Sequence, residues 1–148
     1  MALFESFSIS SSGMTANRLW LDTISNNIAN MNSTGRPGDP AQQPYRRQTP
    51  VFSAAVQQYL LNKNPGRGGP KTAGVKVTGI LHDGAPPQLV HDPSHPHADP
   101  ETGYVAYPNI NVLNEMVNML TATRAYEANV TALNSAKEMA LAALEIGR

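Results

Sequence analysis

Proline and glycine divide this chain into three parts. All twelve prolines lie between Pro37 and Pro108, and nine of the eleven glycines lie between Gly35 and Gly103. Because these two residue types are the strongest breakers of helices, long helices are confined to the two ends. The sequence therefore predicts a mainly α fold with a small β insert, in which the N- and C-terminal helices pack as a coiled-coil-like α-domain.

Three segments follow from this distribution. Residues 1–35 are predicted to form an N-terminal helical arm and residues 109–148 a C-terminal helical arm. Residues 36–108 between them are predicted to form a Pro/Gly-rich insert of β structure and loops. The total of 148 residues suits one domain, or a helical unit that carries a small insert.

The N-terminal arm has the 3.5-residue apolar period of a coiled coil. One heptad position carries Phe7, Met14, Leu21 and Ile28, and the other carries Leu3, Ser10, Asn17, Ile24 and Met31. Gly35 follows this pattern, and we expect it to be the left-handed residue that ends the helix.

The C-terminal arm repeats by fours and threes from about Asn111 to Ile146. Asn111 is the predicted N-cap, and Gly147 stands where the helix should stop. A helix of this length spans about 54 Å, so it needs a partner along its whole extent. The repeating positions are Val112, Met116, Met119, Thr123, Tyr126, Val130, Leu133, Lys137, Ala140 and Leu144.

The apolar stripes of the two arms are the predicted sites of helix packing and assembly. A second apolar row on the C-terminal arm, Leu113, Val117 and Leu120, runs beside the first. We assign helix packing and assembly to Phe7, Met14, Leu21, Ile24, Ile28, Met31, Met116, Met119, Tyr126, Val130, Leu133 and Leu144.

The arms are poor in charge and rich in asparagine. Only three charged residues lie between Glu5 and Met31, and eleven of the thirteen asparagines lie on the arms. These amides either face solvent on an ordinary helical hairpin or fix the register where helices meet several neighbours. The second interpretation makes both faces of each arm interfaces between subunits. The amides assigned to such an interface are Asn17, Asn26, Asn27, Asn30, Asn118 and Asn129.

The insert reads as short strands separated by turns. Candidate strands are residues 45–49, which Pro50 ends, and residues 75–81, 88–91 and 103–107. Residues 51–61 are ambiguous between strand and helix, and residues 64–70 form a predicted loop. A small β-hairpin or meander is the expected arrangement.

Composition excludes several classes of function. Eleven basic and eleven acidic residues cancel, which argues against nucleic acid or an anionic membrane as a partner. No apolar run reaches the length of a membrane span, and no cysteine is present. The N-terminus lacks the basic and long apolar regions of a cleaved secretory signal. Residues 36–82 carry a net charge of +6 and residues 83–101 a net charge of −4, which indicates solvated loops or attraction between neighbouring copies.

One stretch contains the ingredients of a metal site. His91, His95, His97 and Asp92 lie within seven residues, but Pro93 and Pro96 favour an extended loop whose side chains diverge. We therefore expect neither a metal nor another cofactor, and we expect no enzymatic activity.

Both arms resemble a known family. The run from Ser12 to Gly35, and above all Ile24-Ser-Asn-Asn-Ile-Ala-Asn30, resembles the N-terminal signature of the bacterial flagellar rod and hook proteins. The segments Gln43–Arg47, Gly103–Val112 and Arg124–Asn129 are similar to a short, proximal rod member of that family. Together these matches cover some two thirds of the chain.

The resemblance implies a structural subunit of the basal-body rod. Family members leave the cytoplasm through the flagellar type III export apparatus without signal cleavage. They assemble helically with copies of themselves and other rod and basal-body proteins into a hollow shaft that spans the periplasm and transmits torque. Their paired terminal helices form the inner tube, and the insert faces outward.

Two other classes of function compete with this interpretation. One is an export chaperone or adaptor, a soluble helical hairpin that would cap another flagellar subunit. The other is a metal-dependent hydrolase built on the histidine stretch. The low charge of the arms argues against a free soluble hairpin.

Overall fold

Along the chain, one long helix comes first, four strands follow, and a second long helix comes last. The computed structural model describes residues 2–57 and 71–146. Its elements are α1 (Ala2–Ala29), β1 (Gln48–Gln57), β2 (Lys71–His82), β3 (Gln88–His91), β4 (Tyr104–Tyr107) and α2 (Val112–Ile146). The predicted fold class, two terminal helices with a small β insert, is confirmed. The loop predicted at residues 64–70 lies outside the described residues.

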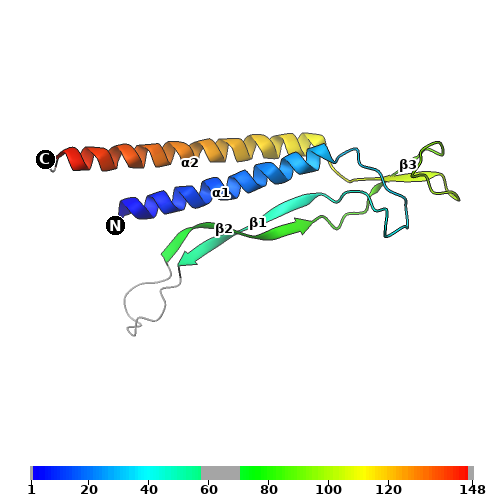
Figure 1. Cartoon of the computed structure of the whole chain (residues 1–148), viewed down its shortest axis with the longest axis horizontal. Helices are drawn as coiled ribbons and strands as arrows, with labels where there is room; N and C mark the ends of the chain where they lie inside the picture. The colour runs from blue at the N-terminus through cyan, green and yellow to red at the C-terminus, as the bar shows by residue number, and fades with distance from the viewer. Residues whose placement is uncertain (1, 58–70, 147–148) are drawn as a thin grey trace, which may run out of the picture.

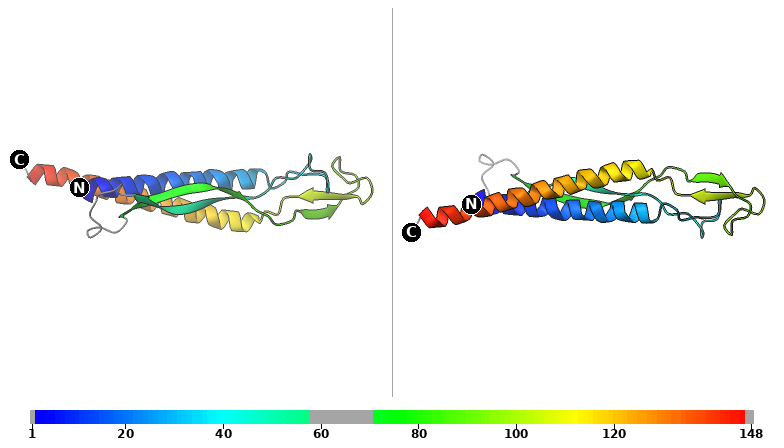
Figure 2. Two further views of the ribbon diagram at one scale, coloured as in Figure 1. Left: turned by 90° about the horizontal axis from the view of Figure 1, so that it is seen from below. Right: turned by 90° about the horizontal axis from the view of Figure 1, so that it is seen from above.

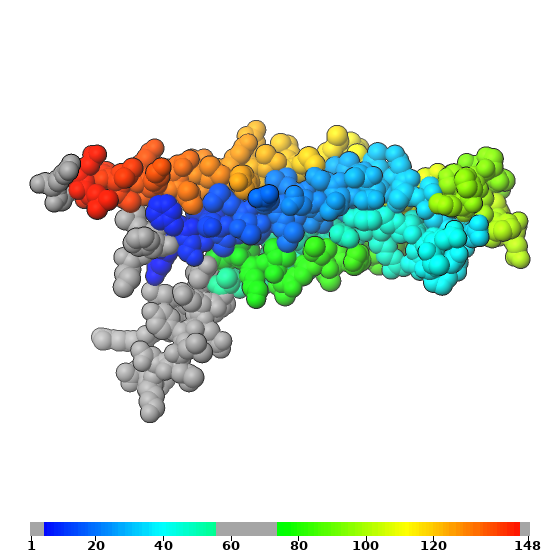
Figure 3. Space-filling model, in the orientation of Figure 1, coloured from blue at the N-terminus to red at the C-terminus, as the bar shows by residue number. Residues whose placement is uncertain are grey.

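The elements form an elongated molecule of three layers (Figures 1 and 3). The two helices run antiparallel, so both ends of the chain lie at the same end of the molecule. The β1–β2 hairpin lies along α1 on the side away from α2, as the views in Figure 2 also show. The β3–β4 hairpin lies at the opposite end, beyond the last turn of α1. Helix α1 is therefore the middle layer, covered on both sides.

Apart from Ile24, the most deeply buried residues along the helix pair are small or polar. In α2, Glu115, Ala122 and Ala136 are buried at heptad positions, and the half-buried Asn129 occupies the position between the two alanines. In α1, the buried residues are Ser10, Gly13, Ala16, Thr23, Ile24 and Asn27. A Cβ added at Gly13 would lie 2.8 Å from the Asn129 Oδ1, so the helices approach closely there.

The buried seam of α2 lies one residue away from the predicted stripe. Met116 and Leu144 are exposed, so they do not pack against α1 within the chain. Glu115, beside Met116, and Ala122, beside the predicted position Thr123, take the innermost positions instead. A period of 3.5 residues locates a helix, but it does not say which of two adjacent stripes faces the partner.

The helix ends agree only in part with prediction. Asn111 is an N-cap, because its Oδ1 accepts the backbone N–H of Asn114 at 3.2 Å. The prediction that Gly35 ends the first helix is wrong, since α1 ends at Ala29. Gly35 instead pairs with Ala106 through two backbone hydrogen bonds of 2.9 Å, and a Cβ there would collide with the Gln42 carbonyl oxygen. Because Gly35 has no side chain, the backbone around Gln42 can pack closely against it.

The first two strands are longer than predicted. Strand β1 begins at Gln48, three residues later than predicted, and the prediction that Pro50 ends it is wrong, since it continues to Gln57. Strand β2 extends the predicted strand at residues 75–81 in both directions. A proline is tolerated because a strand with an unpaired edge can spare one N–H group. The predicted strand at residues 88–91 is confirmed as β3, and that at 103–107 as β4, one residue shorter.

A close contact holds the long hairpin against α1. The Ser12 hydroxyl accepts the backbone N–H of Val75 at 3.1 Å and donates to the carbonyl of Ile9. Gly74, with φ of 108°, permits this approach, since a Cβ there would collide with the Ser12 Oγ. Farther along, the rings of Trp20 and Phe52 meet edge to face at 5.8 Å. The hairpin is thus positioned at two separate places on α1.

Candidate assembly surface and its supporting cluster

A buried asparagine joins the end of α1 to the start of β1. The Asn27 Oδ1 accepts the Gln48 backbone N–H at 2.9 Å and the Tyr45 hydroxyl at 3.0 Å. Its Nδ2 donates to the Gln48 carbonyl at 2.8 Å and to the Glu115 Oε2 at 2.9 Å. Two donors and two acceptors are the full capacity of an amide, so Asn27 is saturated inside the monomer.

A buried carboxylate completes this polar cluster from α2. Glu115 is 1% exposed, and its Oε1 accepts the Nε of Arg47 at 2.9 Å and the Nη2 at 2.6 Å. The Asn118 amide approaches the same oxygen at 3.4 Å. Arg47 is 26% exposed at its side chain, so the ion pair reaches from the interior to the surface. The four side chains of Asn27, Tyr45, Arg47 and Glu115, which we call the polar cluster, link three segments of the chain.

The surroundings of Tyr45 favour its neutral form. Burial raises the pKa of the Tyr45 hydroxyl above its ordinary value, and the negative charge of Glu115 raises it further. The neutral hydroxyl is the form that can donate to Asn27, as the geometry requires.

The sequence predicts an interface role for Asn27 but does not identify the other members of the cluster. Arg47 and Tyr45 belong to the segment noted for its resemblance, and Glu115 is an isolated acid within a run of apolar and amide residues. A lone charge in such a run is a weak signal of burial. Arg47, which pairs with Glu115, lies 68 positions away in the chain, so no local sequence pattern connects the two residues.

The outward side of α2 exposes large apolar residues at its two ends. Near the start, Leu113, Met116, Val117 and Leu120 recur at spacings of three and four, and Leu113 is 73% exposed. Near the end, Leu141 and Leu144 are exposed one turn apart, at the heptad positions of Leu120 and Met116. We call these two sets the first apolar patch and the last apolar patch. Met139 is also exposed, but it has the heptad position of Asn118 and belongs to neither patch.

The middle of α2 is polar on its exposed side. Arg124 and Glu127 form an exposed ion pair of 3.0 Å there, and Thr131 follows one turn later. The last patch lies where α2 extends past the start of α1 (Figure 1). Within α2, the exposed large apolar side chains thus lie toward the two ends of the helix. Among the described residues, exposed large apolar side chains also lie on the strands, Leu81 and Leu89 among them.

The remaining predicted residues differ in their burial. Ile24 is buried, and Asn26 is exposed. The structure brings Asn129 against Gly13 and brings Asn118 to the polar cluster. Half-buried positions are Phe7, Met14, Asn17, Leu21, Ile28, Asn30, Met31, Asn118, Met119, Tyr126, Asn129, Val130 and Leu133.

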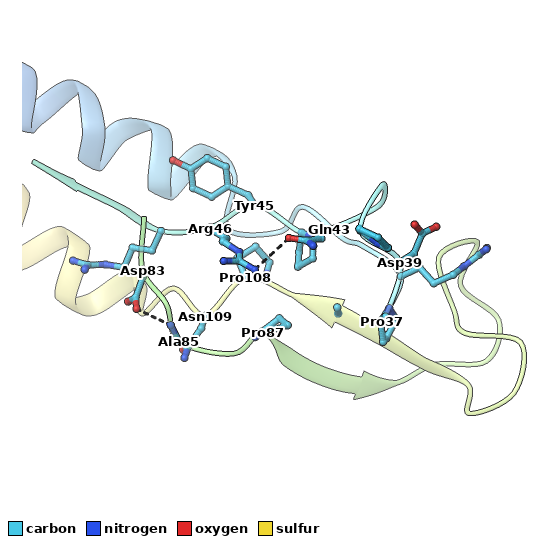
Figure 4. A pocket seen from close by; sticks show the side chains of 16 residues that line it. Pro37, Asp39, Gln43, Tyr45, Arg46, Asp83, Ala85, Pro87, Pro108 and Asn109 are labelled. Carbon is cyan, nitrogen blue, oxygen red and sulfur yellow. Dashed lines mark hydrogen bonds between the residues drawn. The ribbon is translucent and has the colours of Figure 1, made fainter. Parts of the chain in front are cut away.

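A hollow of about 260 Å³ lies beside the polar cluster (Figure 4). Its walls come from the segment after α1, the segment entering β3 and the segment leaving β4. Arg46 and Gln43 are joined by a hydrogen bond of 3.2 Å on one wall. Prolines 37, 40, 44, 87 and 108 line much of the remainder. These rings give the hollow a stiff rim without a nucleophile and base arranged for catalysis.

The histidine stretch is engaged in loop contacts. The His97 Nδ1 is 2.8 Å from the Thr34 hydroxyl, and the His95 Nδ1 accepts the His97 backbone N–H at 3.0 Å. The Ser94 hydroxyl donates to Asp92 and thereby lowers the pKa of that carboxyl. Across residues 2–57 and 71–146, no group of three His, Asp or Glu side chains is placed to hold a metal ion.

Within the described residues, neither α1 nor α2 has a stretch that is long and apolar enough to cross a bilayer.

Comparisons with known proteins match both arms and the whole chain. The family described as "Flagella basal body rod protein" matches residues 7–36, and "Flagellar basal body rod FlgEFG protein C-terminal" matches residues 101–146. A protein of Borreliella burgdorferi named "Flagellar basal-body rod protein FlgC" is 44% identical over 99% of this chain and 98% of its own. Proteins of the same name from Bacillus subtilis and Escherichia coli O6:H1 are each 40% identical over the full length of both chains.

Proposed function

The chain belongs to the FlgC family of flagellar basal-body rod proteins, and on this premise we propose that it polymerises helically into a torque-transmitting shaft after type III export. Membership makes the chain a structural, non-enzymatic component of the basal-body rod that serves motility. Its partners are copies of itself and other basal-body proteins. The finer proposal concerns its route of export, the form of its polymer and its mechanical role.

The observation that carries the proposal is the exposed apolar surface at both ends of α2. The first and last apolar patches together hold six large apolar side chains. Burial of apolar area stabilises an assembly by about 25 cal/mol per Å². Two separate patches on one subunit allow contacts with two neighbours, and a contact that does not close on itself produces a helical polymer.

The fold is consistent with a shaft that carries torque. Two helices and a hairpin run along one long axis and give a stiff rod-like unit (Figure 1). The hairpin covers α1, whereas no described element covers the outward side of α2. We therefore place α2 at the contacts between subunits.

The export proposal draws on the modest core of the monomer. Among the described residues, the buried hydrophobic side chains are those of four alanines, Ile24 and Val105. A core of small side chains contributes little transfer free energy, so unfolding before passage through a narrow channel costs little. Final stability then comes from contacts made in the assembled rod.

The decisive experiment places a charge in the first apolar patch. Val117→Asp should abolish swimming and remove the protein from isolated basal bodies, because a carboxylate would be buried at the subunit contact. Thr131→Asp adds the same charge to the polar middle of the same helix side, and it should swim normally. Export is measured as the amount of each variant outside the cytoplasm, and we expect it to be equal for both. Normal basal bodies carrying Val117→Asp would contradict the proposal.

A further inference from the structure

The seam between α1 and α2 does not define its own register. On α2, positions 115, 122, 129 and 136 repeat every seven residues along the seam, and Gly13 of α1 lies against Asn129. Sliding α2 by one heptad would bring Ala122 or Ala136 to Gly13. Both alanines are already buried and smaller than Asn129. Packing of small residues therefore discriminates poorly between the observed alignment and its neighbours.

The polar cluster behaves differently, because its acid lies on α2 and its base lies in the segment just before β1. Asn27 lies on α1 and holds both the N–H and the C=O of Gln48, so the start of β1 moves with α1. Arg47, which precedes Gln48, therefore also moves with α1, whereas Glu115 moves with α2. A slip of one heptad would carry Glu115 about 10 Å from its partners.

Such a slip would leave a buried carboxylate without its cation. Breaking a buried ion pair in this way is strongly destabilising, whereas replacing the whole pair with apolar side chains is often neutral. A polar residue at a helix seam is known to specify register in this manner. We infer that Asn27, Arg47 and Glu115 form a register lock, which selects one alignment of α1, α2 and the hairpin without being a main source of stability.

Introduced cysteines can measure the register directly, since the chain contains none. A Cβ at position 13 would lie 3.0 Å from the Asn129 Cγ, so Gly13→Cys with Asn129→Cys is close enough for a disulfide. Gly13→Cys with Ala122→Cys, or with Ala136→Cys, reports a slip of one heptad in either direction. In the parent chain, mild oxidation should close only the pair 13–129.

The test compares these pairs after the lock is removed. In full-length chain carrying Asn27→Leu, Arg47→Met and Glu115→Met, the slipped pairs should rise at least about tenfold, because the penalty of the buried charge is gone. Helix content by circular dichroism should stay that of the parent. Glu115→Gln alone, which removes the charge and keeps the shape, should give a smaller rise in the slipped pairs.

A matched control removes the exposed ion pair of the same helix. Arg124→Met with Glu127→Met should leave the pattern of disulfides unchanged, because that pair lies in solvent. The inference is overturned if the triple variant still closes only 13–129, or if it loses its helix content. It is also overturned if the control variant forms the slipped disulfides, or if the parent chain does not form the disulfide between positions 13 and 129. These readouts concern the monomer alone, so they do not depend on the proposed polymer.

Discussion

Single residues without large side chains determine how closely the layers of this molecule approach. Gly13 admits Asn129 from the neighbouring helix, and Gly74 admits the Ser12 hydroxyl from α1. Glycine within a helix lowers helix propensity by roughly 1 kcal/mol relative to alanine, so Gly13 is explained by packing and not by the helix. At the far end, Asn27 uses its full hydrogen-bonding capacity to connect segments that are distant in sequence.

The effect of Gly13→Ala on the melting temperature should depend on the residue at position 129. Alone, it should lower the melting temperature, because its Cβ would stand 2.8 Å from the Asn129 Oδ1 and overpacking costs about 1–3 kcal/mol. In an Asn129→Ala background the contact is gone, and Gly13→Ala should raise the melting temperature through helix propensity. Thermal unfolding followed by circular dichroism measures both steps. The same sign in the two backgrounds would show that the close approach is absent.

Tyr45 should make stability sensitive to alkaline pH. Its pKa is raised in the folded state by burial and then by Glu115, whereas in the unfolded chain it titrates near pH 10. Its contribution is therefore fully present below about pH 10 and is lost as the pH rises toward the folded pKa. Tyr45→Phe should lack this loss while costing about 0.5–1.5 kcal/mol at neutral pH for the missing hydrogen bond to Asn27. Urea unfolding of both proteins from pH 8 to 11 gives the difference, and parallel curves would refute the assignment.

At the scale of elements, the β1–β2 hairpin is the part whose position depends most on a few contacts. One anchor is the hydrogen bond between Ser12 and Val75, and the other is the packing of Trp20 on Phe52. Irregular register between residues 51 and 56 lets the hairpin twist while it follows α1. Losing either anchor should therefore loosen the hairpin while the helix pair remains.

Gly74→Ala should release the hairpin from α1. A Cβ at this position collides with the Ser12 Oγ, and φ of 108° is unfavourable for alanine. Trp20 is the chain's only tryptophan, so its emission should shift to longer wavelength as Phe52 moves away. Gly79→Ala is the matched control, because the same strand offers open space there. Equal emission from the two variants would rule out an anchor at Gly74.

At the scale of the whole molecule, the distribution of apolar surface distinguishes the monomer from its assembly. The interior is made of small side chains and a satisfied polar cluster, while most of the large apolar residues of α2 remain exposed. An ordinary amphipathic helix on a monomer shows the reverse arrangement. Stability and assembly should therefore respond to different residues of the same helix.

Leu144→Asp should separate these two properties. Leu144 is 73% exposed in the last apolar patch, so the free energy of unfolding of the monomer should change by less than about 0.5 kcal/mol. Incorporation into isolated basal bodies should nevertheless fall, because the charge would enter a subunit contact. Ala136→Asp is the opposite case, since Ala136 is buried against α1 and the monomer itself should unfold. Unimpaired incorporation of Leu144→Asp would remove the last patch from the proposed contacts.

The sequence alone was sufficient for the parts of this protein that depend on local chemistry. Clustered prolines and glycines located the insert, the heptad period located the helices, and Asn111 was identified as a cap because a cap is defined by its next three residues. The signature around Ile24 to Asn30 was specific enough to identify the family. The alternating residues of 75–81 predicted β2, but most of β1 was not predicted, because residues 51–61 are compatible with either strand or helix.

Tertiary structure alone decided which faces are buried and which side chains meet. The small-residue seam, the burial of Glu115 and the folding of the hairpin onto α1 all depend on groups that are remote in sequence. Glu115 is buried because Arg47 lies beside it, and Arg47 lies there because Asn27 holds Gln48. Periodicity repeats along one helix and cannot encode such a chain of contacts between helices, so only the three-dimensional arrangement determines it.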